Sequence, residues 1–250
     1  MNPELKSYYR KASKNYDALR FDADEEVANH VRWFVCNRVC SGMKLLDVGC
    51  GTARYSVEFS QHGLEVVGLD HSIDQITQAQ SKGISAQIGQ AEELPFNTDK
   101  FDVVSYVMML HQLDVDQFEK SMAEAVRVLR VGGRIWIKTC SFENLAARPF
   151  TDLFPSTLEI NAKRYQRIEE LVRVLELNGA QLKRKETITD HYELSGAQII
   201  DRTAARHNTT LFLLTDDEFR NGLEGLKKHY ERGENYQLSH QHTLLEFEVG

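Results

Sequence analysis

A glycine-containing turn and one acidic residue are the parts of this sequence whose types and spacing could do chemistry. Residues 45–52 read LLDVGCGT, a short apolar strand that runs into a Gly-Cys-Gly turn and then into a helical stretch. Glycine has no Cβ, so the backbone at Gly49 and Gly51 can pass close to a bound ligand. Asp70 stands 21 residues after Gly49, at the end of the next strand-like run, where a carboxylate can accept hydrogen bonds from both hydroxyls of a ribose. The spacing predicts a nucleoside site at the carboxyl edge of a parallel sheet.

Three nucleoside ligands fit such a turn: NAD, FAD and S-adenosylmethionine (SAM). A plain tight turn without a ligand is the alternative. Arg54 stands where the dinucleotide fingerprint has its third glycine, at the helix N-terminus that a pyrophosphate must approach closely. No second catalytic domain is marked after the predicted sheet. Both features favour SAM over a dinucleotide.

Strands and helices must alternate to position these residues. From residue 44 onward, short β-branched and leucine-rich runs are each followed by a helical stretch, which predicts a parallel sheet with right-handed crossovers. Strands are expected at residues 44–48, 65–69, 85–88, 101–107, 134–139, 181–189 and 241–249. Helices are expected at residues 52–62, 72–81, 118–129 and 168–175. Gly132 and Gly133 are expected to end the third of these helices.

Two outer segments do not follow this alternation. Apolar residues recur at helical spacing in residues 5–16, 27–35, 197–204 and 219–230. Thr215 and Glu218 have the spacing of a capping box that opens the last of these helices. We therefore expect a single domain over residues 1–250, with a nucleoside-binding core at 41–190 and 236–250 and a helical cap at 1–40 and 191–235.

Composition limits the classes of partner. The 250 residues are 42% hydrophobic and 27% charged, as in ordinary globular proteins, and their apolar runs are far shorter than the ~20 residues of a membrane span. A net charge of −7 repels phosphate groups, so binding to nucleic acid or to an anionic membrane is not expected. The four cysteines lack the spacing of a zinc site, and the first residues lack a secretory pattern. These features predict reduced thiols and a cytoplasmic location.

The middle of the chain resembles a known family, the class I SAM-dependent methyltransferases, and in particular the small-molecule group that includes the ubiquinone and menaquinone biosynthesis enzymes. The resemblance covers about residues 44–140 and rests on five motifs in order: LLDVGCGT (45–52), VVGLD (66–70), QAEELPF (90–96), FDVV with LHQL (101–104 and 110–113) and VLRVGGR (128–134). It implies SAM as the cofactor. It also implies a Rossmann-like, seven-stranded, mostly parallel sheet with helices on both faces, an antiparallel last strand and a helical cap.

The resemblance implies cofactor-binding roles for the matching residues of the first two motifs. Gly49, Cys50 and Gly51 would lie under the methionine part of SAM. Asp47 would support that loop, and Asp70 would hold the ribose.

The same resemblance assigns the adenine pocket to residues that follow the second and third strands. His71 and Ile73 would line this pocket. Gln90 stands where the family usually has an acidic residue, but its amide oxygen can still accept a hydrogen bond from the adenine amino group. Ala91 would offer its backbone N–H to the base.

Two further contacts are implied at the methionine end of SAM. The backbone around Val107, after the fourth strand, would face the ammonium group. Residues 12–20 resemble a stretch that folds over SAM in many relatives, so Tyr16 and Arg20 are candidates there, with Arg20 gripping the carboxylate.

Residues for the acceptor side are less constrained by the sequence. Methyl transfer is an in-line displacement, so positioning and the exclusion of water can supply much of the catalysis. His111 is the candidate general base for acceptors that need one, and the alternative is a packing role in the loop after the fourth strand. Arg202, Arg206 and His207 in the cap could meet an acidic acceptor or form a solvated face. The aromatic residues that could line an acceptor pocket, or pack the cap onto the core, are Phe142, Phe150, Phe154 and Tyr165.

The sequence therefore predicts an enzyme that transfers a methyl group from SAM to an O, N or C atom of a small-molecule acceptor. The alternative from another class is a non-catalytic SAM-binding protein or sensor on the same fold. A dehydrogenase on a similar sheet is a third interpretation, which binding of nicotinamide would reveal.

Overall fold

The structure is a computed structural model that describes residues 24–36, 41–146 and 151–250. In this part of the chain, one sheet has the strand order β3-β2-β1-β4-β5-β7-β6. Its strands are β1 (Lys44–Val48), β2 (Glu65–Asp70), β3 (Ser85–Ile88), β4 (Phe101–Val107), β5 (Leu129–Thr139), β6 (Ala180–Ser195) and β7 (Asn235–Val249). The neighbouring strands are parallel except where β7 pairs with β5 and with β6. The expected seven-stranded, mostly parallel sheet with an antiparallel last strand is confirmed.

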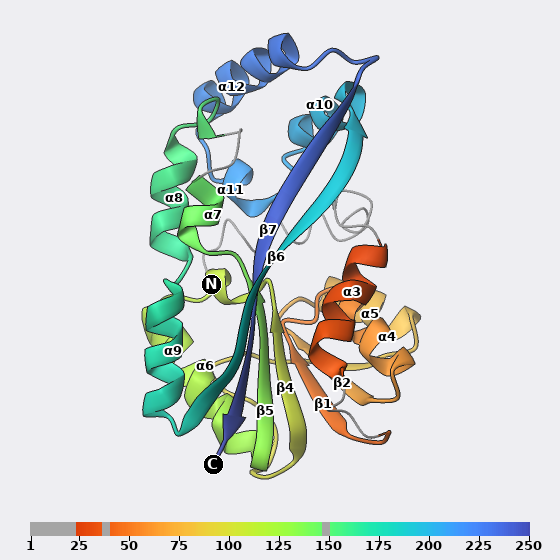
Figure 1. Cartoon of the computed structure of the whole chain (residues 1–250), viewed down its shortest axis with the longest axis vertical. Helices are drawn as coiled ribbons and strands as arrows, with labels where there is room; N and C mark the ends of the chain where they lie inside the picture. The colour runs from red at the N-terminus through yellow and green to blue at the C-terminus, as the bar shows by residue number, and fades with distance from the viewer. Residues whose placement is uncertain (1–23, 37–40, 147–150) are drawn as a thin grey trace.

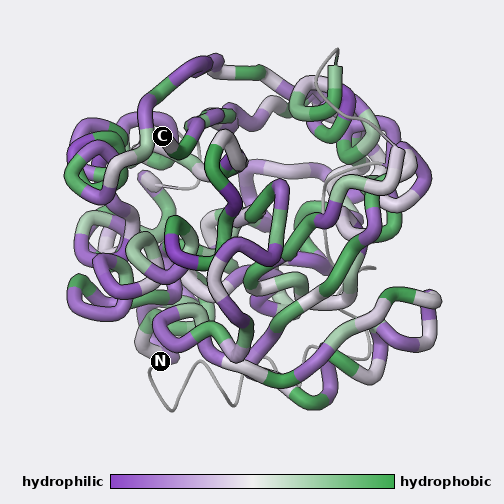
Figure 2. The backbone as a smooth tube through the Cα atoms, turned by 90° about the horizontal axis from the view of Figure 1, so that it is seen from below, coloured by the Kyte–Doolittle hydropathy of each residue, from purple (hydrophilic) through white to green (hydrophobic). Residues whose placement is uncertain are grey.

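Helices cover both faces of this sheet (Figure 1). One face carries α3 (Asp24–Val35), α4 (Arg54–Gln61) and α5 (Ile73–Ser81), and the other carries α6 (Val115–Val128) and α9 (Ile168–Leu177). Purple and green segments alternate along the outer helices, as amphipathic helices require (Figure 2). Each of these helices thus packs one apolar side against the sheet.

Alternate residues of the central strands supply two separate apolar cores. Leu46 and Val104 point to the cluster under α6 and α9, whereas Leu45, Val103 and Trp136 point to the cluster under α3 and α4. Successive side chains of a strand face opposite sides, and a parallel sheet buried on both faces needs apolar residues on both. This explains why β1 is buried along four of its five residues.

The boundary between α6 and β5 differs from the prediction. The helix ends at Val128, and Leu129 already has extended backbone angles and pairs with Phe101. Gly132 and Gly133 therefore do not end a helix. They lie inside β5, where the pairing with β4 shifts register between Phe101 and Val103. An irregularity of this kind inserts extra residues into one strand, and Gly132, with a φ of 75°, supplies the required backbone conformation.

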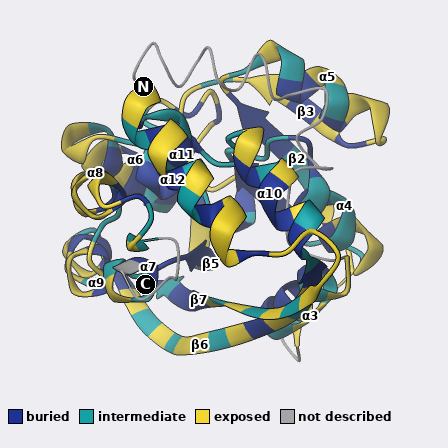
Figure 3. Cartoon of the chain, turned by 90° about the horizontal axis from the view of Figure 1, so that it is seen from above, coloured by how far each residue is buried: buried dark blue, intermediate teal, exposed yellow. Residues whose placement is uncertain are grey.

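The last two strands extend further than the sequence pattern indicated. β6 and β7 pair from Ala180 with Val249 to Ser195 with Asn235, well past the edge of the sheet. They form a two-stranded ribbon that reaches into the upper part of the molecule in Figure 1. The polar character of residues 190–195 and 235–240 concealed this extension, because β6 remains largely exposed on one face (Figure 3).

Helices gather around the far end of this ribbon. They are α7 (Phe142–Ala146), α8 (Ser156–Arg164), α10 (Gly196–Ala204), α11 (Thr209–Phe212) and α12 (Asp216–His229). A third apolar cluster, which includes Phe154, Ile199 and Leu226, joins α8, α10, α11 and α12. The predicted start of α12 is confirmed, since the Thr215 side chain accepts a hydrogen bond from the Glu218 backbone N–H at 3.3 Å.

Among the described helices, none is both long enough and apolar enough to cross a membrane.

Candidate functional site

A cavity of about 440 Å³ opens where β1, β2, β3 and β4 end. In open α/β sheets, ligands bind in the crevice outside the carboxyl ends of the strands, where this cavity lies. Ten of the thirteen residues predicted for the site line it: Asp47, Gly49, Cys50, Gly51, Asp70, His71, Ile73, Gln90, Ala91 and Val107. The fold thus brings together residues that are up to sixty positions apart in the chain.

The glycine turn after β1 has a backbone that only glycine fits easily. Gly49 and Gly51 have φ values of 73° and 53°, in the left-handed region. A Cβ at Gly49 would lie 2.8 Å from the Cβ of Met109, closer than such carbons approach. The N–H groups of Gly49 and Cys50 both donate to the Leu69 carbonyl, at 2.7 and 3.0 Å, and tie the turn to the end of β2.

Asp70 is fixed at the cavity wall by backbone donors. The N–H of Gly51 donates to its Oδ2 at 3.0 Å, and the N–H of Ser72 donates to its Oδ1 at 2.9 Å. The His71 ring nitrogen Nδ1 lies 3.2 Å from Oδ1. Each carboxylate oxygen has more than one acceptor site, so both can still receive a hydrogen bond from a ligand hydroxyl.

Asp47 lies behind the turn and is fully buried. Its carboxylate accepts hydrogen bonds from the hydroxyls of Ser56 and Ser105, the latter at 2.8 Å. Burial raises the pKa of Asp47 to about 6, although both serine hydrogen bonds act in the opposite direction. An acidic group with this pKa is still mostly ionised at neutral pH, and it anchors β1 to both α4 and β4.

Cys50 has a packing role in the turn. A Cβ at Gly68 would lie 2.7 Å from its sulfur, so the absence of a side chain in β2 makes room for the thiol. Burial strongly raises the pKa of Cys50, with the charges of Asp47 and Asp70 adding to the effect. The thiol therefore stays protonated and is not a nucleophile.

Two exposed isoleucines stand on the side of the cavity where an adenine is expected. Ile73 and Ile88 both line the cavity, and they are 58% and 54% exposed. When a flat ligand covers large apolar side chains, the free energy falls because apolar surface is removed from water. Gln90 and Ala91 follow at the same wall, with Ala91 buried. Ile88 was not predicted from the sequence, since it reads only as the last residue of a short strand.

The other end of the cavity is formed by the loop after β4. Val107 ends the strand, and Met108 then has a φ of 52°, which is uncommon for a residue with a side chain. The Met108 N–H donates to the Lys138 carbonyl at 2.8 Å, which fixes this turn against β5. Met108 and Met109 both line the cavity.

Gln75 is a lining residue that sequence reasoning missed. It comes from α5, is 2% exposed, and neither atom of its amide has a hydrogen-bond partner among the described residues. A buried amide without a partner costs free energy that a ligand can recover. The sequence gives no signal for it, because a glutamine at this position of an amphipathic helix looks like a solvated residue.

The structure describes one of the three remaining predicted residues, His111. His111 is buried in a short 3-10 helix, η2 (Leu110–Gln112), and its ring stacks on Tyr165 at 4.5 Å between centroids. It is absent from the cavity lining. Tyr16 and Arg20 lie outside the described residues.

The cationic candidates of the cap make contacts within the cap. Arg206 forms an ion pair with Asp216 at 2.6 Å and lies over the Phe219 ring. The His207 ring nitrogen Nδ1 lies 3.2 Å from the Arg202 carbonyl oxygen. These contacts show packing within the cap, which differs from both predicted roles, contact with an acidic acceptor and a solvated face.

The four aromatic candidates for an acceptor pocket have separate positions. Phe154 is fully buried in the cap cluster, and Tyr165 stacks on His111. Phe142 begins α7, and Phe150 lies outside the described residues.

Comparison with known proteins agrees with this geometry. Residues 46–137 match the family model described as a methyltransferase domain. A demethylmenaquinone methyltransferase from Thermobifida fusca is 33% identical over 116 residues, which are 44% of this chain and 48% of that protein. An uncharacterised methyltransferase from Synechocystis is 35% identical over 97 residues, which are 38% of this chain and 46% of that protein. The chain thus spans about half the length of the curated relatives it matches.

Solved structures resemble the chain over a longer stretch. A SAM-dependent methyltransferase from Thermotoga maritima has a TM-score of 0.60 at 15% identity and covers 100% of both chains. The cyclase SpnF has a TM-score of 0.59 at 18% identity, with 91% of this chain and 82% of that chain covered. At these identities the likeness shows the fold alone, a Rossmann-like fold shared with these solved structures.

Proposed function

We propose that this chain, which carries a class I SAM-dependent methyltransferase domain, transfers a methyl group from SAM to an O, N or C atom of a small molecule. The observation that carries the proposal is the Asp70 carboxylate, which backbone N–H groups hold at the wall of the cavity. A ribose is the ligand part whose paired hydroxyls match such a carboxylate.

The proposal assigns the methionine part of SAM to the turn after β1. Gly49, Cys50 and Gly51 would lie under it, with Asp47 holding the turn from behind. Val107 would face the ammonium group from the loop after β4. Beyond the described residues, Tyr16 and Arg20 are proposed to close over this end, with Arg20 on the carboxylate.

The adenine part of SAM is assigned to the opposite end of the cavity. His71 and Ile73 would cover the base, and Ile88 adds a second apolar side chain to the same pocket. Gln90 and the Ala91 N–H are the polar groups offered to its edge. The unpartnered amide of Gln75 is a further candidate for a polar contact with the cofactor.

Positioning, rather than proton transfer, is proposed as the main contribution of the protein. When bound, SAM supplies an electrophilic methyl group on a sulfonium centre. The residues of this chain would orient the cofactor and the acceptor in line and would exclude water from the cavity. His111 is stacked on Tyr165 outside the cavity lining, so we propose a packing role for it instead of a role as general base.

A non-catalytic SAM-binding role of the same cavity is the second candidate, because this fold does not determine the reaction, as the cyclase SpnF illustrates by having the fold without being named a methyltransferase. Titration calorimetry with SAM, S-adenosylhomocysteine and NAD tests the cofactor first. We expect micromolar or tighter binding of SAM and S-adenosylhomocysteine and no heat with NAD. If the protein binds NAD and does not bind SAM, the proposed cofactor and the proposed function are both wrong.

Catalysis is tested by release of S-adenosylhomocysteine with a panel of acceptors. The panel should include a reduced quinone, since relatives that are about one-third identical over roughly half of their length are demethylmenaquinone methyltransferases. Hydroxyl, amine and carbon acceptors of similar size complete it. Release that depends on one acceptor supports the enzyme, whereas tight SAM binding without release on any of them supports the binding protein.

We also propose a cytoplasmic location and a small-molecule acceptor without nucleic acid or membrane partners. The described cysteines Cys36, Cys50 and Cys140 form no disulfide with one another, as expected in a reducing compartment. The net charge of −7 supports the absence of phosphate-backbone partners.

A further inference from the structure

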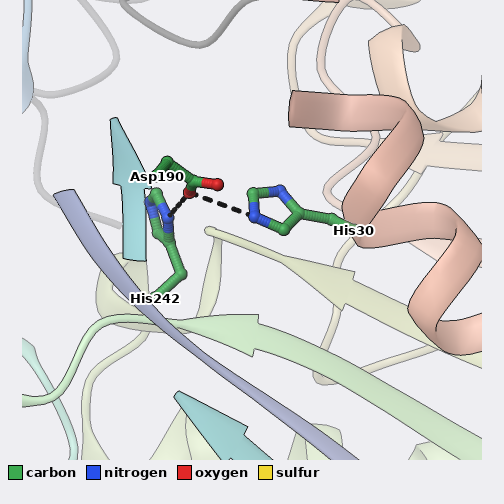
Figure 4. Close-up of side chains that lie close together, drawn as sticks. All are labelled: His30, Asp190 and His242. Atoms are coloured by element: carbon green, nitrogen blue, oxygen red, sulfur yellow. Dashed lines mark hydrogen bonds and ion pairs between the residues drawn. The ribbon is translucent and has the colours of Figure 1, made fainter. Parts of the chain in front are cut away.

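Away from the cavity, three buried side chains from separate elements converge on one point (Figure 4). They are His30 of α3, Asp190 of β6 and His242 of β7. The Asp190 oxygen Oδ2 lies 3.1 Å from His30 Nε2 and 2.8 Å from His242 Nδ1. All three candidate ligand atoms lie within 4.8 Å of one another.

The fold gives a reason for this convergence. In the β6–β7 ribbon, Asp190 pairs with His240 while His242 pairs with Ile188, so Asp190 and His242 are diagonal neighbours on one face. His30 lies on the buried side of α3, where the other buried residues are Val27, Val31 and Phe34. A histidine in an otherwise apolar helical stripe needs a polar partner, and the ribbon provides it.

The chemistry of the three groups is that of a metal centre. Two imidazoles and one carboxylate form a common ligand set for Zn²⁺ and other divalent transition metals. With bonds of about 2.0–2.1 Å to a tetrahedral ion, ligand atoms lie roughly 3.3 Å apart. The two separations between Asp190 Oδ2 and the histidine nitrogens are already near that value.

The charge state of Asp190 also suits the binding of a metal cation. Burial raises its pKa, but hydrogen bonds and charge interactions with His242 and His30 outweigh burial and hold the pKa below its ordinary value. The carboxylate is therefore anionic in the folded protein. A buried anion is stabilised when a cation lies beside it.

A supporting contact orients the His30 ring. Its other nitrogen, Nδ1, lies 3.0 Å from the Tyr55 hydroxyl, which also accepts a hydrogen bond from the buried Lys138 ammonium group at 2.7 Å. Histidines that bind metals usually engage a polar group through their second ring nitrogen, which fixes the ring and its tautomer. Tyr55 also lines the nucleoside cavity, so this cluster lies one side chain away from it.

We propose that His30, Asp190 and His242 bind one divalent transition-metal ion, with Zn²⁺ as the best match to the ligand set. The ion joins α3 to the β6–β7 ribbon and keeps an open coordination position, because three side chains of the described part of the chain are placed to bind it. The site is distinct from the cavity assigned to SAM and does not depend on the proposed methyl transfer.

The test uses the full chain, purified without a polyhistidine tag and stripped with a chelator. ZnCl₂ is titrated in competition with a chromophoric chelator, and CoCl₂ is titrated while its visible absorption is recorded. We expect one equivalent of Zn²⁺ with micromolar or tighter affinity. Co²⁺ should give the visible bands of a site with nitrogen and oxygen ligands.

Variants connect the binding to the three side chains. Asp190→Asn and His242→Ala should each weaken Zn²⁺ binding by roughly 100-fold or more, because the first replaces the anionic carboxylate with a neutral amide and the second removes an imidazole ligand. His229→Ala, which removes an exposed histidine at the end of α12, is the matched control and should bind like the wild type. Circular dichroism checks that each variant is folded.

Two outcomes overturn the proposal. One is a wild-type chain that takes up no stoichiometric Zn²⁺. The cluster would then be a hydrogen-bonded polar network only, and this result does not depend on the folding of any variant. The other is folded Asp190→Asn protein that binds Zn²⁺ as tightly as the wild type. Calorimetry with S-adenosylhomocysteine on the same metal-free samples tests the proposed function separately. Failure of the metal-site proposal can thus be distinguished from failure of the proposed methyl transfer.

Discussion

The cavity at the carboxyl ends of β1 to β4 and the His30–Asp190–His242 cluster are built in different ways. The cavity wall comes mainly from one stretch of chain, residues 47–117, and its shape depends on backbone conformation at a few glycines. The cluster has no glycine requirement and unites side chains from α3, β6 and β7, which are up to 212 residues apart. A site made by backbone is visible as a local motif, whereas a site made by distant side chains is visible only after folding.

The two regions also differ in how they respond to loss of one side chain. In the cavity, backbone N–H groups donate to the Asp70 carboxylate, which also faces the cavity where a ligand is expected. Removal of this side chain should therefore affect ligand binding more than folding. In the cluster, the groups already satisfy one another inside the protein, so removal of one member should affect folding more than SAM binding.

Asp190→Ala provides the largest test of this contrast. In metal-free protein, the change leaves two buried histidines without their shared acceptor, and we expect the free energy of unfolding to fall by about 3–5 kcal/mol. Urea denaturation measures this. Asp217→Ala, at an exposed ion pair on α12, is the control and should unfold like the wild type. A loss of SAM affinity without loss of stability would remove the distinction between the two regions.

Asp70→Ala tests the other side of the contrast. The proposed role of Asp70 is to accept hydrogen bonds from the ribose, so its loss should weaken SAM binding by roughly 1.5–3 kcal/mol while the protein stays folded. Calorimetry measures the dissociation constant, and Asp116→Ala, in the exposed first turn of α6, is the matched control. An unchanged dissociation constant in Asp70→Ala would remove this residue from the site.

The sequence predicted the cavity well because its physical requirements are local. The run LLDVGCGT sets a strand, a left-handed turn and a helix within eight residues, and Asp70 follows at the end of the next strand. Alternation of strands and helices then fixed the parallel sheet. These motifs and the family resemblance predicted ten of the residues that line the cavity, whereas Ile88 and Gln75, which also line it, were not predicted.

The remaining features depend on long-range packing that no local pattern encodes. His30, Asp190 and His242 carry no recognisable spacing, and the register of β6 on β7 decides that they meet. The same register extends both strands into the cap, although their sequences are polar there. Gly132 looked like a helix end because glycine serves both as a helix stop and within irregular strand pairing.

Asp47 allows a pH test within the cavity region. Its pKa is raised from 3.8 to about 6, so the folded state binds more protons than the unfolded state between these values. Stability contributed by this group is therefore present below pH 4 and is lost as the pH rises to about 6, by about 1–3 kcal/mol. Asp47→Asn should lack this loss. We expect the difference in unfolding free energy between wild type and variant to change with pH across this window and to be constant above it.

Gln75→Met has the smallest expected effect. It tests whether one side chain of the cavity lowers stability and favours ligand binding at the same time. The buried Gln75 amide has no partner among the described residues, so an apolar side chain of similar length should stabilise the ligand-free protein by about 1 kcal/mol. If the amide serves the cofactor, SAM binding should weaken at the same time, by a similar amount. Urea denaturation and calorimetry on one preparation measure both quantities. Gln78→Met is the control on the same helix, since Gln78 is absent from the cavity lining and should show neither change. Higher stability with unchanged SAM affinity would mean that the amide is only an uncompensated buried group. Lower stability would mean that it makes contacts within the folded chain, and the proposed role of Gln75 in binding would then have no support.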